Sequence, residues 1–432
     1  MTEQTQTPVN VTDGAYVNFA TNLGTGRDKA SHGKFVKNIA LGDQDFEAAY
    51  EDWLAKKIIN RPVQDMLRAG WFYTGIKEAQ AKKMADEVNR LHLPRKLYTA
   101  LKYTRLYGKA YILIGFSGGS LEDSIDWDGV RRGELQFFTV LKKSQVEIAQ
   151  GTALIPPSQN NGDPNQPEYY QVRTIEGSQT KHKVHYKRLV EIKNGEEAES
   201  VLLAIYRTLL QFVGTNSAGA SLVHEAKIDV IQMPGLIDAL KSRMKDTVER
   251  FAAAAFMKSI NGMLVLDASE KYESKTNNFG GLPELMREFA AQTAAAADIP
   301  FTVLFGQTTS GLNNSGEFDL RNYYDRINTD QQWFLHPVLL PLLRLIYQSL
   351  FGKAPVGMDI KFYPLWQLDY KTRSEVERNN AERDAKYLEK GIVNEAHVAK
   401  QLREDGTYDY IDDAYIKSLE AVAESYNGSE TD

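Results

Sequence analysis

The sequence predicts an α+β fold, with short strands mainly in the first half of the chain and helices dominating the second half. Three observations predict this class. Apolar residues recur at helical spacing over residues 46–69, short apolar or alternating runs occupy residues 110–192, and amphipathic helical patterns follow from residue 197 onward. With 432 residues, 42% of them hydrophobic and 25% charged, the chain has an ordinary globular composition and is long enough for about two to four domains.

Residues 1–43 are expected to form a flexible arm, because they are polar and lack the basic start and apolar core of a signal peptide. A mixed α/β domain is predicted over residues 44–232. Its expected helices are 46–69, 79–91, 95–107 and 197–213, and its expected strands are 110–116, 135–146, 169–174 and 184–192. Glycine, serine and asparagine at 214–219 predict a turn after the last of these helices.

Two helices around an excursion are expected next. They are predicted over residues 233–260 and 282–299, and each carries one apolar stripe. The stripe residues are Ile237, Leu240, Met244, Val248, Phe251 and Ala255, then Leu285, Met286, Phe289, Thr293 and Ala296. The excursion, residues 261–281, is predicted to be strand-like at 263–267 and a polar loop at 269–281. The two helices are expected to return on each other as a hairpin.

Residues 300–316 are predicted to form a flexible loop between two helices. A short apolar run after Pro300 leads into residues 306–316, which contain three glycines and no charged residue. A segment of this composition is typical of one that contacts a surface without binding it tightly.

A long helix is predicted to begin at Glu317, within a region that extends through a following strand to residue 364. Ser315 precedes the helix, and two acids in its first turn favour the helix dipole. Pro337 and Pro341 must bend or split this helix, because each removes a backbone donor and clashes with the preceding turn.

Residues 365–432 predict an acidic helical end, with clear helices at 374–390 and 394–403. This end contains 9 Lys+Arg and 16 Asp+Glu, a net charge of −7 against −6 for the whole chain, which leaves +1 for the remainder. A nearly neutral body with an acidic end is a poor clamp for nucleic acid, whose binding needs clustered Lys and Arg. It is a reasonable conduit for DNA, because a lining that does not attract phosphates does not trap them.

Two candidate ligand sites lack residues that they would need. Gly306 and Gly311 have the glycine spacing of a Walker A motif, but Leu312 and Asn313 replace the required Lys and Ser/Thr. The acidic turn at 124–129 has no acid at the twelfth position of a calcium loop. Both segments are therefore expected to be ordinary loops.

Catalytic and metal-binding constellations are also not indicated. His182 and His185 would point to opposite faces of a predicted strand, among several cations. The chain has no cysteine, and no paired-acid or Ser-His-Asp spacing stands out. The residues therefore nominate no metal site, no cofactor site and no catalytic group.

Several blocks of residues occur in a characteristic order. They are 58–66 followed by Gly70-Trp71, the helix–glycine–strand run 100–116, the run 185–195, the helix–loop–helix run 297–319, and Gly316-Glu317-Phe318-Asp319 with Asn322-Tyr323-Tyr324-Asp325 and Gln331-Gln332. Together these blocks, within roughly residues 45–400, resemble the portal proteins of tailed bacteriophages.

The resemblance implies a portal-like fold. Its parts would be an N-terminal arm (1–43), a wing (44–232), stem helices (233–260 and 282–299), a clip (261–281), a tunnel loop (300–316), a long kinked wing helix with the following strand (317–364) and a helical crown (365–432).

The resemblance also implies a ring-shaped channel at one capsid vertex, commonly of twelve copies, assembled in the host cytoplasm and retained in the virion. Double-stranded DNA would pass through it without sequence specificity. The other implied partners are the terminase large subunit, head-completion or adaptor proteins, and the major capsid and scaffold proteins, with no membrane. The tunnel-loop residues expected at the DNA are Gln307, Thr308, Thr309, Ser310, Asn313 and Asn314. The clip residues expected at docking partners are Lys271, Tyr272, Lys275 and Phe279.

Two other function classes remain open. A nucleic-acid-processing enzyme of a phage packaging module would need a metal-binding acid cluster or a phosphate-binding lysine on a suitable turn. A helical adaptor protein would be a monomer or dimer rather than a large ring. Particle size therefore discriminates most directly between the portal interpretation and the adaptor.

Overall fold

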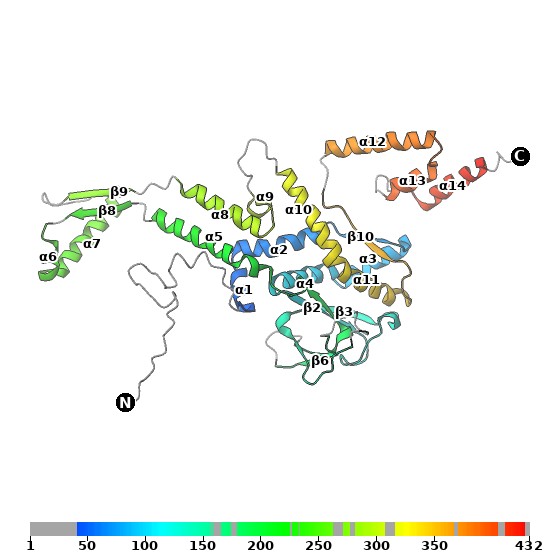
Figure 1. Ribbon diagram of the computed structural model, residues 1–432, viewed down its shortest axis with the longest axis horizontal. Coiled ribbons are helices and arrows are strands. Elements are labelled where there is room, and N and C mark those ends of the chain that lie inside the picture. The colour runs from blue at the N-terminus through cyan, green and yellow to red at the C-terminus, as the bar shows by residue number, and fades with distance from the viewer. Residues whose placement is uncertain are drawn as a thin grey trace, which may run out of the picture. The chain divides into compact units, whose positions relative to one another are not determined.

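The computed structural model describes residues 41–156, 158, 166–173, 179–224, 227–232, 234–261, 271–276, 281–306, 316–366, 370–404 and 411–427. The chain divides into two compact units, Met1–Tyr363 and Pro364–Asp432, and each is described by itself. Figure 1 labels the elements. The first unit mixes helices with small antiparallel sheets, so the predicted α+β class is confirmed.

The first helices are α1 (Asp43–Tyr50), α2 (Trp53–Arg68), α3 (Glu78–Arg90) and α4 (Leu93–Tyr107). The single helix predicted over 46–69 is in fact two. The Asp52 carboxylate accepts hydrogen bonds from the N–H groups of Leu54 (2.8 Å) and Ala55 (3.4 Å), and this cap starts α2 anew. The apolar stripe of α2 is buried, and α2 packs against α4. The sequence therefore predicted the buried face correctly but missed the break.

Six strands described in the first unit form two three-stranded antiparallel sheets. β2 (Lys109–Phe116) lies between β3 (Leu135–Lys142) and β7 (Leu189–Lys193), and β5 (Tyr169–Val172) lies between β4 (Val146–Ile148) and β6 (His182–His185). The strands predicted over 135–146 and 184–192 each split, because the chain crosses between the sheets at short turns, Lys143–Gln145 and Tyr186–Arg188.

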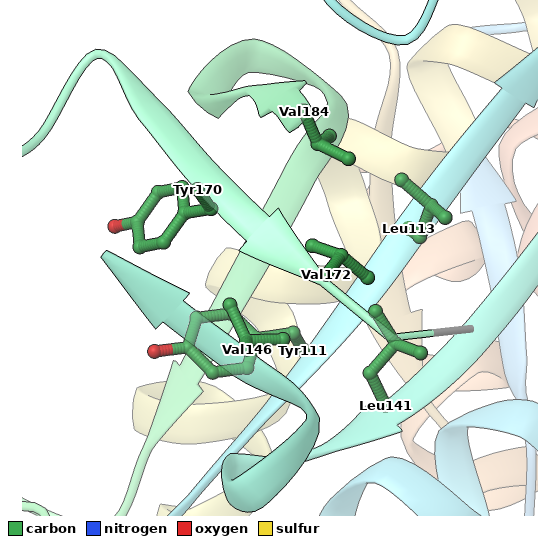
Figure 2. Close-up of a cluster of buried hydrophobic side chains, with 7 residues drawn as sticks. All are labelled: Tyr111, Leu113, Leu141, Val146, Tyr170, Val172 and Val184. Atoms are coloured by element: carbon green, nitrogen blue, oxygen red, sulfur yellow. The ribbon is translucent and has the colours of Figure 1, made fainter. Parts of the chain in front are cut away.

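The two sheets share a hydrophobic cluster, shown in Figure 2. Its members are Tyr111 and Leu113 from β2, Leu141 from β3, Val146 from β4, Tyr170 and Val172 from β5, and Val184 from β6. Helix α4 packs against the first sheet as well. Strand β2 is therefore buried along almost its whole length, which explains why it reads as a continuous apolar run rather than an alternating one.

Helix α5 (Val201–His224) runs straight through the turn predicted at 214–219. Helix α8 (Leu282–Ala296) packs along it, and Figure 1 shows the two side by side. A Cβ added to Gly219 would lie 3.4 Å from Met286 Sδ, so the small residue permits the close approach of the helices. The hairpin partner of the second predicted helix is therefore α5, not the helix expected over 233–260.

The segment between α5 and α8 contains β8 (Lys227–Gln232), α6 (Leu236–Ser242), α7 (Met244–Asn261) and β9 (Lys271–Thr276). The helix predicted over 233–260 is thus two helices, which pack against each other. Strands β8 and β9 pair antiparallel, so the polar residues 271–276 are not the predicted loop. The strand predicted at 263–267 lies outside the described residues.

The long helix predicted from residue 317 is interrupted as expected. It consists of α10 (Glu317–Asp330), a π-helical turn (Gln331–Leu335) and α11 (His336–Phe351). The π turn ends at Leu335, two residues before Pro337, whose missing N–H cannot continue the ordinary α-helical hydrogen-bond pattern. The predicted interruption is therefore present before Pro337 as a π turn, whereas α11 continues through Pro341 without a break.

By length and hydropathy, one helix among the described residues, Phe318–Phe351, could cross a membrane. Half of its most apolar window is buried inside the protein, which also fits a core helix.

The strand predicted after this helix is β10 (Asp359–Phe362), which pairs antiparallel with β1 (Trp71–Thr74).

The second unit contains α12 (Tyr370–Glu389), α13 (Glu395–Glu404) and α14 (Asp413–Asn427). Its described core is small and joins α13 to α14 through Ala399, Ile411 and Ile416. Both helices predicted in this unit are confirmed.

Candidate DNA-channel site

The predicted tunnel loop begins with a helix, because residues 301–305 form α9 (Phe301–Phe305). Helix α8 ends at Ala296, and Asp298, with a φ of 56°, then turns the chain. The N–H of Ile299 bonds back to the carbonyl of Ala294 at 3.1 Å. Pro300 precedes α9, where its fixed φ suits a helix start. The apolar run after Pro300 is therefore a helical turn with Leu304 buried, rather than part of a loop.

Helix α9 is fixed to α2 and α5 by aromatic rings and by one cation. The ring of Phe305 lies 5.9 Å from that of Trp53, 5.7 Å from that of Phe212 and 4.9 Å from that of Phe301. Lys57 Nζ donates to the Leu304 carbonyl at 2.6 Å. This places a positive charge at the carboxyl end of α9, where the helix dipole favours it.

The two ends of the following segment lie close together. Gly306 ends α9 with a φ of 71°, and Gly316 starts α10 with a φ of 67°. A Cβ added to Gly316 would come 3.2 Å from Thr302 Cγ2, so α10 begins directly beside α9. The segment therefore leaves and returns at one fixed base. Its predicted DNA-contacting residues (Gln307, Thr308, Thr309, Ser310, Asn313 and Asn314) lie outside the described residues.

A buried acid attaches α10 to α2. The Asp65 carboxylate accepts hydrogen bonds from Tyr323 Oη at 3.0 Å and from Arg61 Nε at 2.8 Å, and Arg68 Nε lies 3.4 Å away. Burial, together with the Asp65 charge, raises the pKa of Tyr323, so the phenol stays a donor at neutral pH. Asp65 belongs to the block 58–66 but was assigned no role from the sequence, although an acid on the apolar stripe of a helix is a signal for a buried polar contact.

Arg105 replaces a hydrogen bond that Pro62 removes from the interior of α2. Pro62 has no N–H, so it cannot bond the Ile58 carbonyl four residues earlier. Arg105, buried on α4, donates through Nη2 to the Ile58 carbonyl at 3.1 Å and through Nε to the Ile59 carbonyl at 3.2 Å. Burial, reinforced by the nearby Arg326 charge, lowers the pKa of Arg105 to about 10, so it remains charged at neutral pH.

An ion pair connects α10 to the end of α8. Arg326 Nη1 lies 2.7 Å from Asp298 Oδ2 and also donates to the Asp298 carbonyl. Burial raises the pKa of the neighbouring Asp330, and the charges of Arg326 and Arg105 oppose this effect. The base of the predicted loop therefore combines apolar packing at α9 with polar attachment at α10.

Three of the four predicted clip residues lie in strand β9, and the fourth lies outside the described residues. Tyr272 and Lys275 lie in β9, opposite Ile231 and Ile228 of β8, so they are strand residues rather than loop-tip residues. Lys271 is exposed at the start of β9, opposite Gln232. Phe279 lies outside the described residues.

The remaining candidate motifs have local structural roles. The Asp126 side chain caps the short helical turn at Trp127 by accepting the Asp128 N–H at 3.2 Å. His185 is buried, and its Nδ1 accepts the Lys187 N–H at 3.2 Å. In the part of the chain that the structure describes, no group of three or more His, Cys, Asp or Glu could hold a metal ion.

Curated relatives of this chain include longer proteins. The chain is 32% identical over 389 residues to the anti-CBASS protein Acb1 of Caulobacter sp. (strain RHG1), covering 84% of this chain and 61% of that protein. It is 31% identical over 418 residues to an uncharacterised protein of Haemophilus influenzae (strain ATCC 51907 / DSM 11121 / KW20 / Rd), covering 93% and 92%. The chain therefore spans about three fifths of the length of the first relative and almost the whole of the second.

Two solved structures have a similar chain path. One belongs to the virion of a native gene transfer agent particle, with 12% identity, a TM-score of 0.48 and coverage of 86% of this chain and 95% of that chain. The other is an HK97-family phage portal protein from Corynebacterium diphtheriae, with 10% identity, a TM-score of 0.42 and coverage of 76% and 97%.

A family model described as phage portal protein matches residues 44–386, which is most of the chain. The match includes both three-stranded sheets, the α5–α8 pair, α9 and the interrupted long helix. The chain belongs to the phage portal protein family.

Proposed function

We propose that this chain is a portal subunit that forms a ring-shaped channel at one capsid vertex, through which DNA is packaged and ejected. The observation that carries this proposal is the family match over residues 44–386. The channel would dock the terminase large subunit during packaging and head-completion or adaptor proteins afterwards, beside the major capsid and scaffold proteins. The chain would perform no chemistry itself.

Exposed apolar side chains on the helices support assembly into a ring. They include Leu210 and Val213 on α5, Met244, Val248 and Phe256 on α7, and Leu285 on α8. Five of the six are more than half exposed in the single chain, and apolar surface of this kind commonly marks a protein interface. Because α8 packs along α5, we propose these two helices as the stem and the segment from β8 to β9 as the clip. Neighbouring copies would cover the exposed faces.

The ring can be tested by particle size. Native mass spectrometry and negative-stain images of the purified protein should show closed rings, with a mass of about 580 kDa for twelve copies of the 48.7-kDa chain. A monomer in dilute buffer alone would be compatible with conditional assembly. A monomer that persists with scaffold and capsid proteins present would contradict the proposal and favour a helical adaptor.

The clip can be tested by alanine substitution. Tyr272→Ala or Phe279→Ala should weaken binding of terminase or adaptor proteins by about fivefold or more in Kd, which corresponds to about 1 kcal/mol. The reason is that aromatic side chains are enriched among the few residues that dominate the binding energy of an interface. Binding of purified rings to terminase can be measured by biolayer interferometry. Tyr272→Phe and Phe279→Tyr are matched controls, because each keeps an aromatic side chain at its position. If either alanine variant abolishes ring formation and residual rings bind normally, the residue belongs to subunit packing.

A further inference from the structure

Helix α11 carries a projecting loop on one flank and a groove on another. Successive residues turn about 100° around a helix, so His336 and Arg344 share one flank. Pro337, Val338 and Pro341 share a second flank, about 100° further round. The loop and the groove described below therefore face different directions from one buried helix.

The loop, residues 353–356, follows the end of α11 and is called the knob here. Lys353, Ala354 and Val356 are exposed, and Val356, at 92%, is the most exposed large apolar side chain in the described part of the chain. Single exposed apolar residues are common on protein surfaces and need no explanation by themselves. The knob differs from them because contacts with α11 hold the chain that follows it.

These contacts lie on the first flank of α11. Arg344 Nη2 donates to the carbonyl of Met358 at 2.9 Å, two residues after Val356. His336 Nε2 lies 2.9 Å from Asp359 Oδ1, one residue further along. Met358 is itself completely buried. A projecting tip that is already held in place loses less conformational freedom on binding than a free loop does, and this favours its use as a contact.

The groove lies on the second flank and has a volume of about 450 Å³. Its walls come from the start of α11, from the short helical turn at Trp127 and from the chain that enters β7. Apolar and aromatic side chains dominate the lining, and they include Ile125, Trp127, Tyr186, Pro337, Val338 and Pro341. The charged residues Asp126 and Lys187 also contribute to it.

Hydrogen bonds fix the walls of the groove in the single chain. Trp127 Nε1 donates to the Lys187 carbonyl at 2.8 Å and joins two of the walls. Gln348 Nε2 donates to the carbonyls of Asp128 at 2.9 Å and Val130 at 3.2 Å, and joins one of these walls to α11. The groove is therefore formed before anything enters it, and apolar pockets of this kind are where a partner's anchor residues bind most strongly.

The proposed ring requires two different contact surfaces on each copy. In a closed ring, each copy touches one neighbour with one surface and the other neighbour with a second surface, whereas a two-fold dimer pairs one surface with itself. A knob and a groove on two flanks of one helix meet the requirement of the ring. Both belong to the first unit, and both lie outside the α5–α8 pair.

We propose that the knob of one copy fills the α11 groove of the next copy in the ring, with Val356 against Pro337 and Pro341. Lys353, beside the tip, would then lie near Asp126 of the groove, and their opposite charges would favour the same register. The contact rests on the proposed ring-forming function and adds to it a specific subunit interface on the long helix.

Oxidative cross-linking of the full chain tests this contact. The chain has no cysteine, so Val356→Cys/Val338→Cys introduces two thiols into an otherwise thiol-free protein. Docking would bring them within the separation of about 7 Å between Cα atoms that a disulfide allows. Oxidation should give a ladder of covalent multiples of the 48.7-kDa chain on a non-reducing gel, and reduction should return it to monomer. Only a head-to-tail contact extends the ladder beyond a dimer.

Two kinds of variant control for the cross-link. Each single cysteine variant should give no ladder, since one thiol joins at most two copies. Val356→Cys/Ile148→Cys is the matched double variant, because Ile148 is also an exposed apolar residue, at 61%, but lies on β4 outside the groove. It should give no ladder either.

A charge at the tip of the knob supplies a second measurement. Val356→Asp would place a carboxylate in an apolar groove, which is costly without a partner. The protein concentration at which half of the chains are in rings should therefore rise by about tenfold or more. Ile148→Asp adds the same charge outside the groove and should leave that concentration unchanged.

The outcomes separate failure of the contact from failure of the proposed function. Normal rings without a ladder, or cross-linking that stops at dimers, would overturn the contact and leave the portal function intact. A ladder that continues into open filaments, with no closed ring from the unaltered chain, would keep the contact and remove the portal function. Val356→Asp rings that form normally but are not built into capsids would show that the knob contacts a capsid protein instead, which also overturns the proposal.

Discussion

Capsids built with the Thr308→Lys/Asn313→Lys variant should package DNA slowly and incompletely, although their rings form normally. The predicted tunnel loop has no charged residue between Gly306 and Gly316. The variant would add two cations per subunit, about two dozen around the DNA in a ring of twelve. Each new phosphate contact adds an attraction that resists sliding. The rate of packaging by purified capsids and terminase measures this effect.

The salt dependence identifies the cause of the defect. Each added phosphate contact should weaken about 3.5-fold when the salt concentration rises fourfold, so the variant should recover toward the unaltered rate at higher salt. Thr308→Gln/Asn313→Gln is the matched control, because it lengthens both side chains without charge. Packaging at the unaltered rate at low salt would show that residues 308 and 313 do not line the DNA path.

Replacing Arg105 with methionine should lower the free energy of unfolding of the first unit by about 2–4 kcal/mol. Arg105→Met keeps an unbranched apolar stem, shorter than that of arginine, and removes the guanidinium that donates to the Ile58 and Ile59 carbonyls. The Ile58 carbonyl then has no α-helical donor, because Pro62 lacks an N–H. Urea unfolding followed by tryptophan fluorescence measures the loss.

A double-mutant cycle tests the proposed partnership of Arg105 and Pro62. Pro62→Ala supplies the missing N–H, so it should restore about 1 kcal/mol more in the Arg105→Met background than in the unaltered chain. Arg105→Lys, which keeps the charge but loses the planar fork, should have an intermediate effect. Independent effects of the two substitutions would mean that Arg105 stabilises α2 by some route other than replacing the proline donor.

The elements that the sequence predicted well are those in which burial follows local spacing. The apolar stripe of α2, the continuous run of β2 and the proline interruption of the long helix each result from residues near one another in the chain. The family resemblance also depended on short blocks of neighbouring residues that follow one another in a fixed order. The family match confirms it.

Which helices pack against each other could not be predicted from local spacing. Glycine, serine and asparagine at 214–219 predicted a turn, but α5 continues through them, and α8 packs against α5 with Met286 beside Gly219. Local propensity is a weak guide where a helix packs against a neighbour, because tertiary contacts supply most of its stability. The same contact replaced the predicted hairpin partner of α8 with α5.

For the candidate site, the sequence by itself determined composition and order: an uncharged, glycine-containing segment between two helices, and a break in the second helix. Only the tertiary structure showed what holds the base of that segment. Lys57 and Trp53 on α2 meet α9 across more than 200 residues of chain, and Asp65 and Tyr323 meet across a similar separation. Periodicity reports which face of an element is buried, but it does not report which distant element covers that face, because many partners bury the same apolar stripe equally well.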